Sequence, residues 1–251
     1  GMTWSLTNNV GYQPALVSLD GAVGSIGLRT PQIRYSHKLN DKLGYSLALE
    51  YSEPQIQIPD SINASAIQVI PDLTARLTYN TERLSLRFSG AFTTVSGRVI
   101  DNTIEYAPGY LLSLAGIISS VRGGNLYFSL SGGHATSHFV DTFGGKNQDL
   151  VFDPNQFRFS PLDYWAGYIS YSHDLPKNFS ASLSAGYSDI NNQDFQFDRA
   201  FSNSYNTLIN LFWDPAEGAR LGLEFAHGKR VDKGDDSGYS NRISLLMYYD
   251  F

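Results

Sequence analysis

The sequence predicts an all-β fold, a transmembrane antiparallel up-and-down β-barrel of about twelve strands in a single domain over residues 1–251. Three observations predict it. Apolar and polar residues alternate along many short stretches, long and short connections alternate between these stretches, and the chain ends in an aromatic residue, Phe251. A barrel strand needs only every second side chain to be apolar, so the fold requires no long apolar run.

The composition excludes several other classes of protein. The chain is 42% hydrophobic and 14% aromatic but only 17% charged, whereas disordered chains are poor in aromatic residues and rich in charge. The absence of cysteine excludes a disulfide scaffold. The net charge of −6 argues against a nucleic-acid partner, which needs a basic face. The composition fits a secreted β-sandwich as well as a barrel, so alternation and connection lengths must decide.

Each predicted strand is a stretch whose side chains alternate with a period of two, which places one set on each face of a sheet. The stretch that ends at Phe251 shows this best, because Ile243, Leu245, Met247 and Tyr249 share one face and polar residues dominate the other. The pattern is weaker at 110–120, 126–132, 165–171 and 205–213. The predicted strands are 2–6, 32–39, 45–52, 73–80, 84–89, 110–120, 126–132, 165–171, 179–187, 205–213, 220–225 and 239–251.

The connections between the predicted strands are of two kinds. Short ones hold turn residues at 40–41, 80–82, 122–124, 174–177 and 214–218. Long ones cover 7–28, 53–70, 97–108, 135–159, 190–200 and 229–238. Their regular alternation is typical of an outer-membrane barrel with short periplasmic turns and longer outer loops, whereas a soluble sandwich has no reason to keep it.

Aromatic residues gather at the ends of the predicted strands, as in the girdles that mark the two membrane interfaces. The final stretch, Leu245 to Phe251, resembles the terminal signal of Gram-negative outer-membrane proteins, which end in an aromatic residue with aromatic or apolar residues at every second position before it. This resemblance implies a location in the outer membrane of a Gram-negative bacterium.

A second resemblance covers residues 1–55. The runs Gly1-Met2-Thr3-Trp4-Ser5, Arg29-Thr30-Pro31-Gln32-Ile33-Arg34-Tyr35 and Leu47-Ala48-Leu49-Glu50 resemble segments of DcaP-type porins. Such porins have further strands and a coiled-coil segment before the Thr-Trp-Ser strand. We therefore expect N-terminal strands and a signal peptide to be missing here. The resemblance also implies uptake of anionic solutes and assembly as a homotrimer.

Basic residues dominate the polar faces of the predicted strands. If the apolar faces contact lipid, Arg34, Lys38, Arg76, Arg87, Arg220 and Arg242 line the lumen, against the acidic Glu50 and Glu224. Arginines in a narrow pore attract anions and offer a planar fork to carboxylates. In the competing interpretation they pair with Glu50, Glu224 and Asp250 and fill a narrow barrel. The sequence leaves both interpretations open.

Two long connections stand out. The connection from Gly132 to Phe159 either folds into the pore or forms an exposed loop, which is slightly favoured. The connection over 7–28 is rich in apolar residues, among them Leu16, Val17 and Ile26. Because exposed apolar loops are disfavoured, we expect it to pack inside the barrel or against a neighbouring subunit.

An enzyme of the outer-membrane phospholipase type is one alternative, since such barrels have a similar length and use Ser and His near the outer rim. The candidates are His134, Ser137 and His138, but the His-x-Ser-Asn-Gly arrangement of those enzymes is absent. The acidic stretches 191–194 and 232–236 lack the spacing of a known calcium loop. We therefore expect no enzymatic activity, catalytic residue, cofactor or metal.

The sequence thus predicts an outer-membrane porin for passive diffusion of small, anionic solutes through an arginine-lined lumen. The expected partners are outer-membrane lipid, lipopolysaccharide and these solutes, with no nucleic acid. Besides the phospholipase-type enzyme, a non-conducting structural or adhesive barrel is the alternative.

Overall fold

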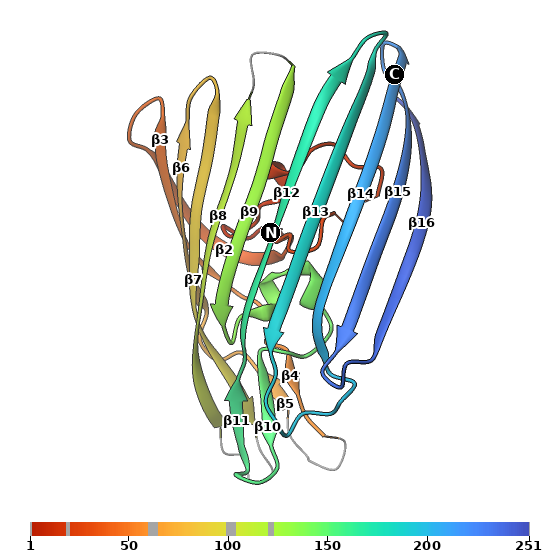
Figure 1. The fold of residues 1–251 in the computed structure, drawn as a ribbon. Coiled ribbons are helices and arrows are strands. Elements are labelled where there is room, and N and C mark those ends of the chain that lie inside the picture. The colour runs from red at the N-terminus through yellow and green to blue at the C-terminus, as the bar shows by residue number, and fades with distance from the viewer. Residues whose placement is uncertain (1, 19–20, 60–64, 99–103, 120–122, 251) are drawn as a thin grey trace.

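The computed structural model describes residues 2–18, 21–59, 65–98, 104–119 and 123–250. Its main element is a 13-stranded antiparallel sheet that curves into a tall barrel wall (Figure 1). Only β5 (Ser65–Ile67), which pairs with β7, lies off the path of neighbouring strands. This architecture confirms the predicted fold class and the expected number of about twelve strands. No helix of the described residues is long and apolar enough to cross a membrane.

Every predicted strand is present in the sheet. The strands of the sheet follow one another in chain order, so that consecutive strands are hydrogen-bonded neighbours. They are β1 (Met2–Trp4), β2 (Arg29–Lys38), β3 (Leu43–Glu50), β6 (Asp72–Asn80), β7 (Leu84–Arg98), β8 (Ile104–Ser119), β9 (Gly124–His134), β12 (Asp163–Leu175), β13 (Phe179–Asn191), β14 (Phe201–Ala216), β15 (Ala219–Asp232) and β16 (Ser237–Tyr249).

The register separates two faces of the wall. Ala48, Thr74, Ala91 and Leu111 occupy one row across β3, β6, β7 and β8, and all four are buried on the inner face. Their neighbours in the chain, such as Leu49, Leu73 and Phe92, are exposed on the outer face. An exposed apolar band on the outside is what a bilayer requires of a barrel.

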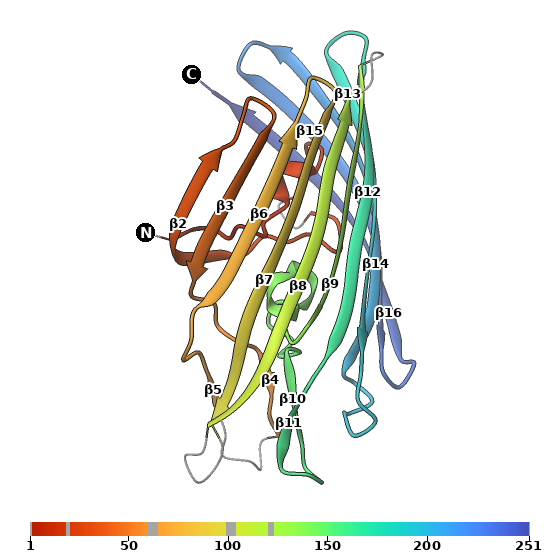
Figure 2. The ribbon, with the colours of Figure 1, turned by 90° about the vertical axis from the view of Figure 1, so that its left-hand side faces the viewer.

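The turns and loops lie at opposite ends of the wall (Figures 1 and 2). Short turns join β2 to β3, β6 to β7, β12 to β13 and β14 to β15, whereas residues 51–59, 65–71, 135–162 and 192–200 of the long connections lie toward the other end. The predicted bounds of two long loops, 97–108 and 229–238, are wrong. β7 runs to Arg98 and β8 starts at Ile104, while β15 ends at Asp232 and β16 starts at Ser237, so both connections are shorter than expected. These strand ends carry polar residues on both faces, so the alternation ends before the strands do.

Two segments fold into the barrel. Residues 5–28, of which 19–20 lie outside the described residues, include the 3-10 turn η1 (Val10–Tyr12) and bury Leu6, Tyr12 and Ile26. Of the two outcomes expected for the 7–28 connection, inside the barrel or against a neighbouring subunit, its described residues show the first. Residues 135–149 form the second, with the 3-10 turns η2 (Ser137–Phe139) and η3 (Asp141–Phe143).

The slight preference for an exposed 132–159 loop was wrong for its first half. Phe139, Val140 and Phe143 are fully buried against Ile26, Leu111 and Tyr164, because burial of these large apolar side chains outweighs the tendency of a loop to lie outside. The second half contributes β10 (Leu150–Asp153) and the start of β11 (Arg158–Pro161), which form a small sheet with β4 (Ile56–Gln57) below the barrel in Figure 1.

The outermost strands of the sheet are β1 and β16. Within the described residues β1 pairs only with β2 and β16 only with β15, and no pairing joins these two edges. Nearly all of β16 is exposed, including Arg242 on its inner face. Residues Ser237 to Ser240 of this strand line one interior cavity.

Candidate functional site in the barrel interior

Arg34, Arg76 and Arg87 all face the interior, from β2, β6 and β7. The guanidinium of Arg34 donates to the Trp4 carbonyl at 2.6 Å and to Gln32 Oε1 at 2.8 Å. Half-buried Arg76 makes only a 3.5 Å contact from Nη2 to Ser46 Oγ. These three cations therefore share the inner face of one stretch of the wall.

Arg87 is held by the inward-folded segment. Its guanidinium donates to the carbonyl of Asn8 and lies 4.7 Å from the ring centre of Tyr12. The Tyr12 hydroxyl in turn bonds to Ser85 Oγ at 3.2 Å. Arg87 therefore fixes residues 5–28 against the wall, and part of its charge is used in that contact.

Arg220 and Arg242 form ion pairs. Arg220 grips Asp214 through Nε and Nη2 at 2.6 and 2.7 Å, close to the β14–β15 turn. Arg242 Nη2 lies 3.5 Å from Glu224 Oε1 across β15 and β16. Arg242 thus pairs with one of the acids named in the competing interpretation, whereas Arg220 pairs with Asp214, which that interpretation did not name.

The two predicted acids do not line water. Glu50 is fully buried and accepts hydrogen bonds from the Leu6 amide at 2.8 Å, Thr74 Oγ1 at 2.7 Å and Thr30 Oγ1 at 3.2 Å. Glu224 is also fully buried. Glu50 therefore anchors the start of the inward-folded segment, a role that period-two alternation does not reveal.

Residues 5–28 cross the interior from β9 to β14. Asn9 Nδ2 donates to Ser129 Oγ at 2.7 Å, while Asn210 Oδ1 and Asn206 Oδ1 accept from the amides of Val17 at 3.0 Å and Val23 at 2.8 Å. Each bond joins the segment to a polar side chain on the inner face of the wall. The segment is therefore a fixed constriction of the lumen.

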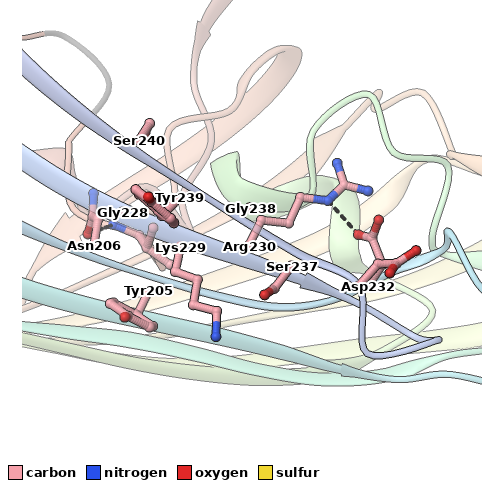
Figure 3. A pocket seen from close by; sticks show the side chains of 12 residues that line it. Tyr205, Asn206, Gly228, Lys229, Arg230, Asp232, Ser237, Gly238, Tyr239 and Ser240 are labelled. Carbon is pink, nitrogen blue, oxygen red and sulfur yellow. Dashed lines mark hydrogen bonds and ion pairs between the residues drawn. The ribbon is translucent and has the colours of Figure 1, made fainter.

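Two cavities remain beside this segment. One of about 820 Å³ lies between residues 5–28 and 135–149 and is lined by Arg29, Lys146 and Asp141. The other, of about 640 Å³, lies along the first part of β14, the last part of β15 and the first part of β16 (Figure 3). Both are lined by Val23 and Asn206, so the two cavities adjoin each other.

A basic pair borders these cavities. Lys146 Nζ and the Arg230 guanidinium each lie 5.5 Å from the ring centre of Phe201. Burial lowers the pKa of Lys146, and the nearby charge of Arg230 lowers it further. Figure 3 shows Arg230 beside Asp232, to which it is bonded at 2.7 Å, while Lys229 points the opposite way.

The sequence prediction missed Arg29, Lys146 and Arg230 as lumen residues. Arg230 lies six positions beyond Glu224, so it shares the inner face, but the predicted strand stopped at 225. Lys146 depends on the fold of residues 135–149, and Arg29 stands just before the first predicted alternating residues. Extending the alternation past its last apolar residue would have found Arg230.

Asp141 is the acid of the larger cavity. Its Oδ1 accepts from the Gly27 amide at 3.1 Å, which ties the two inward-folded segments together. Burial raises the pKa of Asp141 to about 6, against a smaller lowering by the Gly27 bond. This carboxyl therefore changes its charge within the range of natural growth conditions.

The three candidates for an enzyme do not form a common site. His134 lies on the outer side, stacked on Tyr110 and paired with Asp163 at 2.6 Å. Ser137 and His138 are buried inside and both bond to Asp149. In the described part of the chain no three His, Asp or Glu side chains are grouped so that they could hold a metal ion.

Comparisons with known proteins agree with this architecture. A model of the family described as DcaP outer membrane protein matches residues 1–251. The outer membrane channel DcaP of Acinetobacter baumannii superposes with a TM-score of 0.88 at 19% identity, covering 100% of this chain and 70% of that one. No curated protein matches the sequence.

More distant structures share the fold. The anion-selective porin from Comamonas acidovorans has a TM-score of 0.58 at 10% identity, with 88% of this chain and 60% of that chain covered. OmpT, an outer membrane protein of Vibrio cholerae, has a TM-score of 0.56 at 10% identity, with 99% and 74% covered. At such identities these structures establish the fold alone.

Proposed function

Because the chain belongs to the DcaP outer membrane protein family, we propose that it forms a channel through which small anionic solutes diffuse passively. The family match over the whole chain confirms the resemblance seen at residues 1–55 and 245–251, and with it the location in a Gram-negative outer membrane. Family and fold point to a channel rather than an enzyme. Anion preference is the further step that we propose.

The observation that carries this proposal is the set of cations at the open lumen. Arg29, Lys146 and Arg230 border the two cavities, and Arg34 and Arg76 face the same interior from β2 and β6. The smaller cavity is lined by the cations Lys229 and Arg230 and by the acids Asp232 and Asp236, whereas the larger cavity is lined by a single acid, Asp141. A surplus of positive charge in a narrow, low-dielectric passage concentrates anions.

Reversal potentials across a planar bilayer with a salt gradient test the proposal. We expect the sign of the reversal potential to show that anions are more permeant than cations. This preference should weaken in concentrated salt because ions screen the field. A sign that favours cations contradicts the proposal. Since the chain has no cysteine, blocking of engineered thiols beside the cavities then reports where the current flows.

A non-conducting structural barrel is the second candidate, because two segments occupy the interior and reduce the passage. Single-channel recording separates the two functions. Resolved current steps favour the channel, and a silent bilayer with correctly folded protein favours the structural barrel.

We also propose partners that follow from the outer face. The exposed apolar side chains contact outer-membrane lipid and lipopolysaccharide, and the family resemblance suggests a homotrimer. Native mass spectrometry in mild detergent tests both. A trimer that retains lipopolysaccharide is expected, whereas a lipid-free monomer contradicts this part of the proposal.

A further inference from the structure

A buried relay of four side chains lies beneath the lumen, outside the channel chemistry described above. His138 Nδ1 lies 2.8 Å from Asp149 Oδ2, and His138 Nε2 lies 3.0 Å from Ser52 Oγ. Ser52 Oγ also bonds to Asp72 Oδ2. None of the four residues is more than 5% exposed. We call the set Asp72, Ser52, His138 and Asp149 the buried relay.

The order Ser–His–Asp resembles a hydrolytic triad, but Ser52 is not available as a nucleophile. It is 4% exposed, and its hydroxyl contacts the Asp72 carboxyl as well as the imidazole. A triad serine must instead reach a substrate carbonyl. The relay therefore needs another explanation.

The hydrogen bonds of the relay determine how many protons its side chains hold. Asp149 accepts from His138 Nδ1, so that nitrogen carries a proton. Ser52 has one proton for two partners. If it donates to Asp72, His138 Nε2 must donate to Ser52. If it donates to His138, Asp72 must carry a proton of its own. Both arrangements contain one mobile proton shared by Asp72 and His138 through Ser52.

The relay joins the loops that shape the lumen. Asp72 begins β6, Ser52 follows β3, and His138 and Asp149 belong to the inward-folded residues 135–149. Asp149 Oδ1 also accepts from Ser137 Oγ at 2.8 Å and from the His138 amide at 3.0 Å. Its Oδ2 accepts from the Gln55 amide at 2.7 Å. Movement of residues 135–149 out of the lumen would break the relay.

We propose that His138 is the positioning residue of residues 135–149, and that loss of the proton it shares with Asp72 releases them from the lumen. The inference rests on the proposed channel function, since it assigns that channel a pH-dependent constriction. Without the shared proton, one hydrogen bond of the relay has no donor, and the buried carboxylates at its two ends remain with no cation between them. A buried acceptor that loses its donor is destabilising.

The direction of the pH dependence follows from the surroundings of His138. Burial lowers its pKa, but the charge and hydrogen bond of Asp149, with the charge of Asp72, raise the pKa on balance. Among the described residues these two acids are the charged groups that shift the pKa of His138. The ring centre of Phe139 lies 4.3 Å from that of the imidazole. A raised pKa stabilises the folded loop at lower pH, and this contribution is lost as pH rises above the ordinary histidine range.

Cysteine labelling tests the release without requiring conduction. Val140 is fully buried beside His138, and the chain has no other cysteine to react. We expect the labelling rate of Val140→Cys, divided by that of the exposed Thr81→Cys, to rise about tenfold per pH unit between the ordinary histidine pKa and the raised pKa of His138, and to be constant at lower pH. In the His138→Gln background the ratio should be high at every pH. Single-channel conductance should rise over the same pH range.

The matched control is His134→Gln, because His134 also contacts a carboxylate but lies on the outer side. It should leave the labelling profile unchanged. If His138→Gln prevents folding, Ser52→Ala breaks the relay at its centre and should flatten the profile as well. A labelling ratio that does not change with pH, or a pH profile that persists in Ser52→Ala, overturns the inference. A protein that labels as expected but carries no current contradicts only the channel function.

Discussion

At the scale of the residue, the carboxylate of Glu50 shows how a charge on the inner face organises the lumen. It is fully buried and bonds to Leu6, Thr74 and Thr30, which belong to three separate segments. Hydrogen bonds to a charged group contribute more than neutral ones, and a donor left unsatisfied in the interior is destabilising. The position of residues 5–28 therefore depends on this side chain.

We expect Glu50→Ala to lower the free energy of unfolding by about 3 kcal/mol, because the Leu6 amide and the Thr74 hydroxyl lose their acceptor. Unfolding in phospholipid vesicles, followed by tryptophan fluorescence, measures this. The exposed Glu53→Ala is the control and should change stability by less than about 0.5 kcal/mol. Equal effects of the two substitutions would refute the anchoring role.

Asp141 gives the lumen a second pH dependence, at a lower pH than that of His138. Because the pKa of Asp141 is about 6, the carboxyl is charged above this pH and neutral below it. The anion preference measured by reversal potential should therefore increase as pH falls through about 6. Asp141→Asn keeps an acceptor for Gly27 and should show the stronger preference at all pH values. A variant that still titrates near 6 would contradict this assignment.

Alternation in the sequence assigned the inner face correctly for Arg34, Arg76 and Arg87, because parity alone decides on which face of a strand a side chain lies. It did not reveal that Arg220 pairs with Asp214, and it left open whether an arginine pairs with Glu224, as Arg242 does. Such pairs depend on register between strands and on side-chain reach, which periodicity does not contain. The sequence pattern therefore predicts the face on which a side chain lies but not its partner on another strand.

At the scale of the element, two segments that carry no long strand determine the free space in the barrel. Residues 5–28 are attached to β14 through Asn206 and Asn210, and residues 135–149 are attached to them through Asp141. The apolar content of 7–28 predicted its burial. The burial of 135–149 was not predicted, since Phe139 and Phe143 are too few to distinguish a buried loop from an exposed one.

Asn206→Ala combined with Asn210→Ala should loosen residues 5–28, because the amides of Val23 and Val17 lose their acceptors. We expect larger and noisier single-channel currents. Asn203→Ala is the matched control, since Asn203 lies on the same strand and bonds only to its neighbour Ser202. An unchanged conductance in the double variant would mean that residues 5–28 do not limit the current.

At the scale of the whole molecule, charge and apolar surface are sorted by location. The chain carries a net charge of −6, yet cations face the lumen while many acids lie in the loops and turns. The outer face is apolar and exposed, as a bilayer requires. Period-two alternation predicted this sorting because each strand has only two faces, whereas strand ends such as those of β7 and β15 lie where the alternation no longer applies.

We attribute the anion preference of the channel to the cations at the two cavities. The most direct test is the reversal potential of a variant with Lys146→Gln and Arg230→Gln, compared with Lys42→Gln. Lys42 is exposed in the β2–β3 turn and lines neither cavity. We predict that the double variant moves toward a non-selective pore while Lys42→Gln keeps the original potential. A double variant with the original potential, or an equal shift in Lys42→Gln, would contradict this prediction.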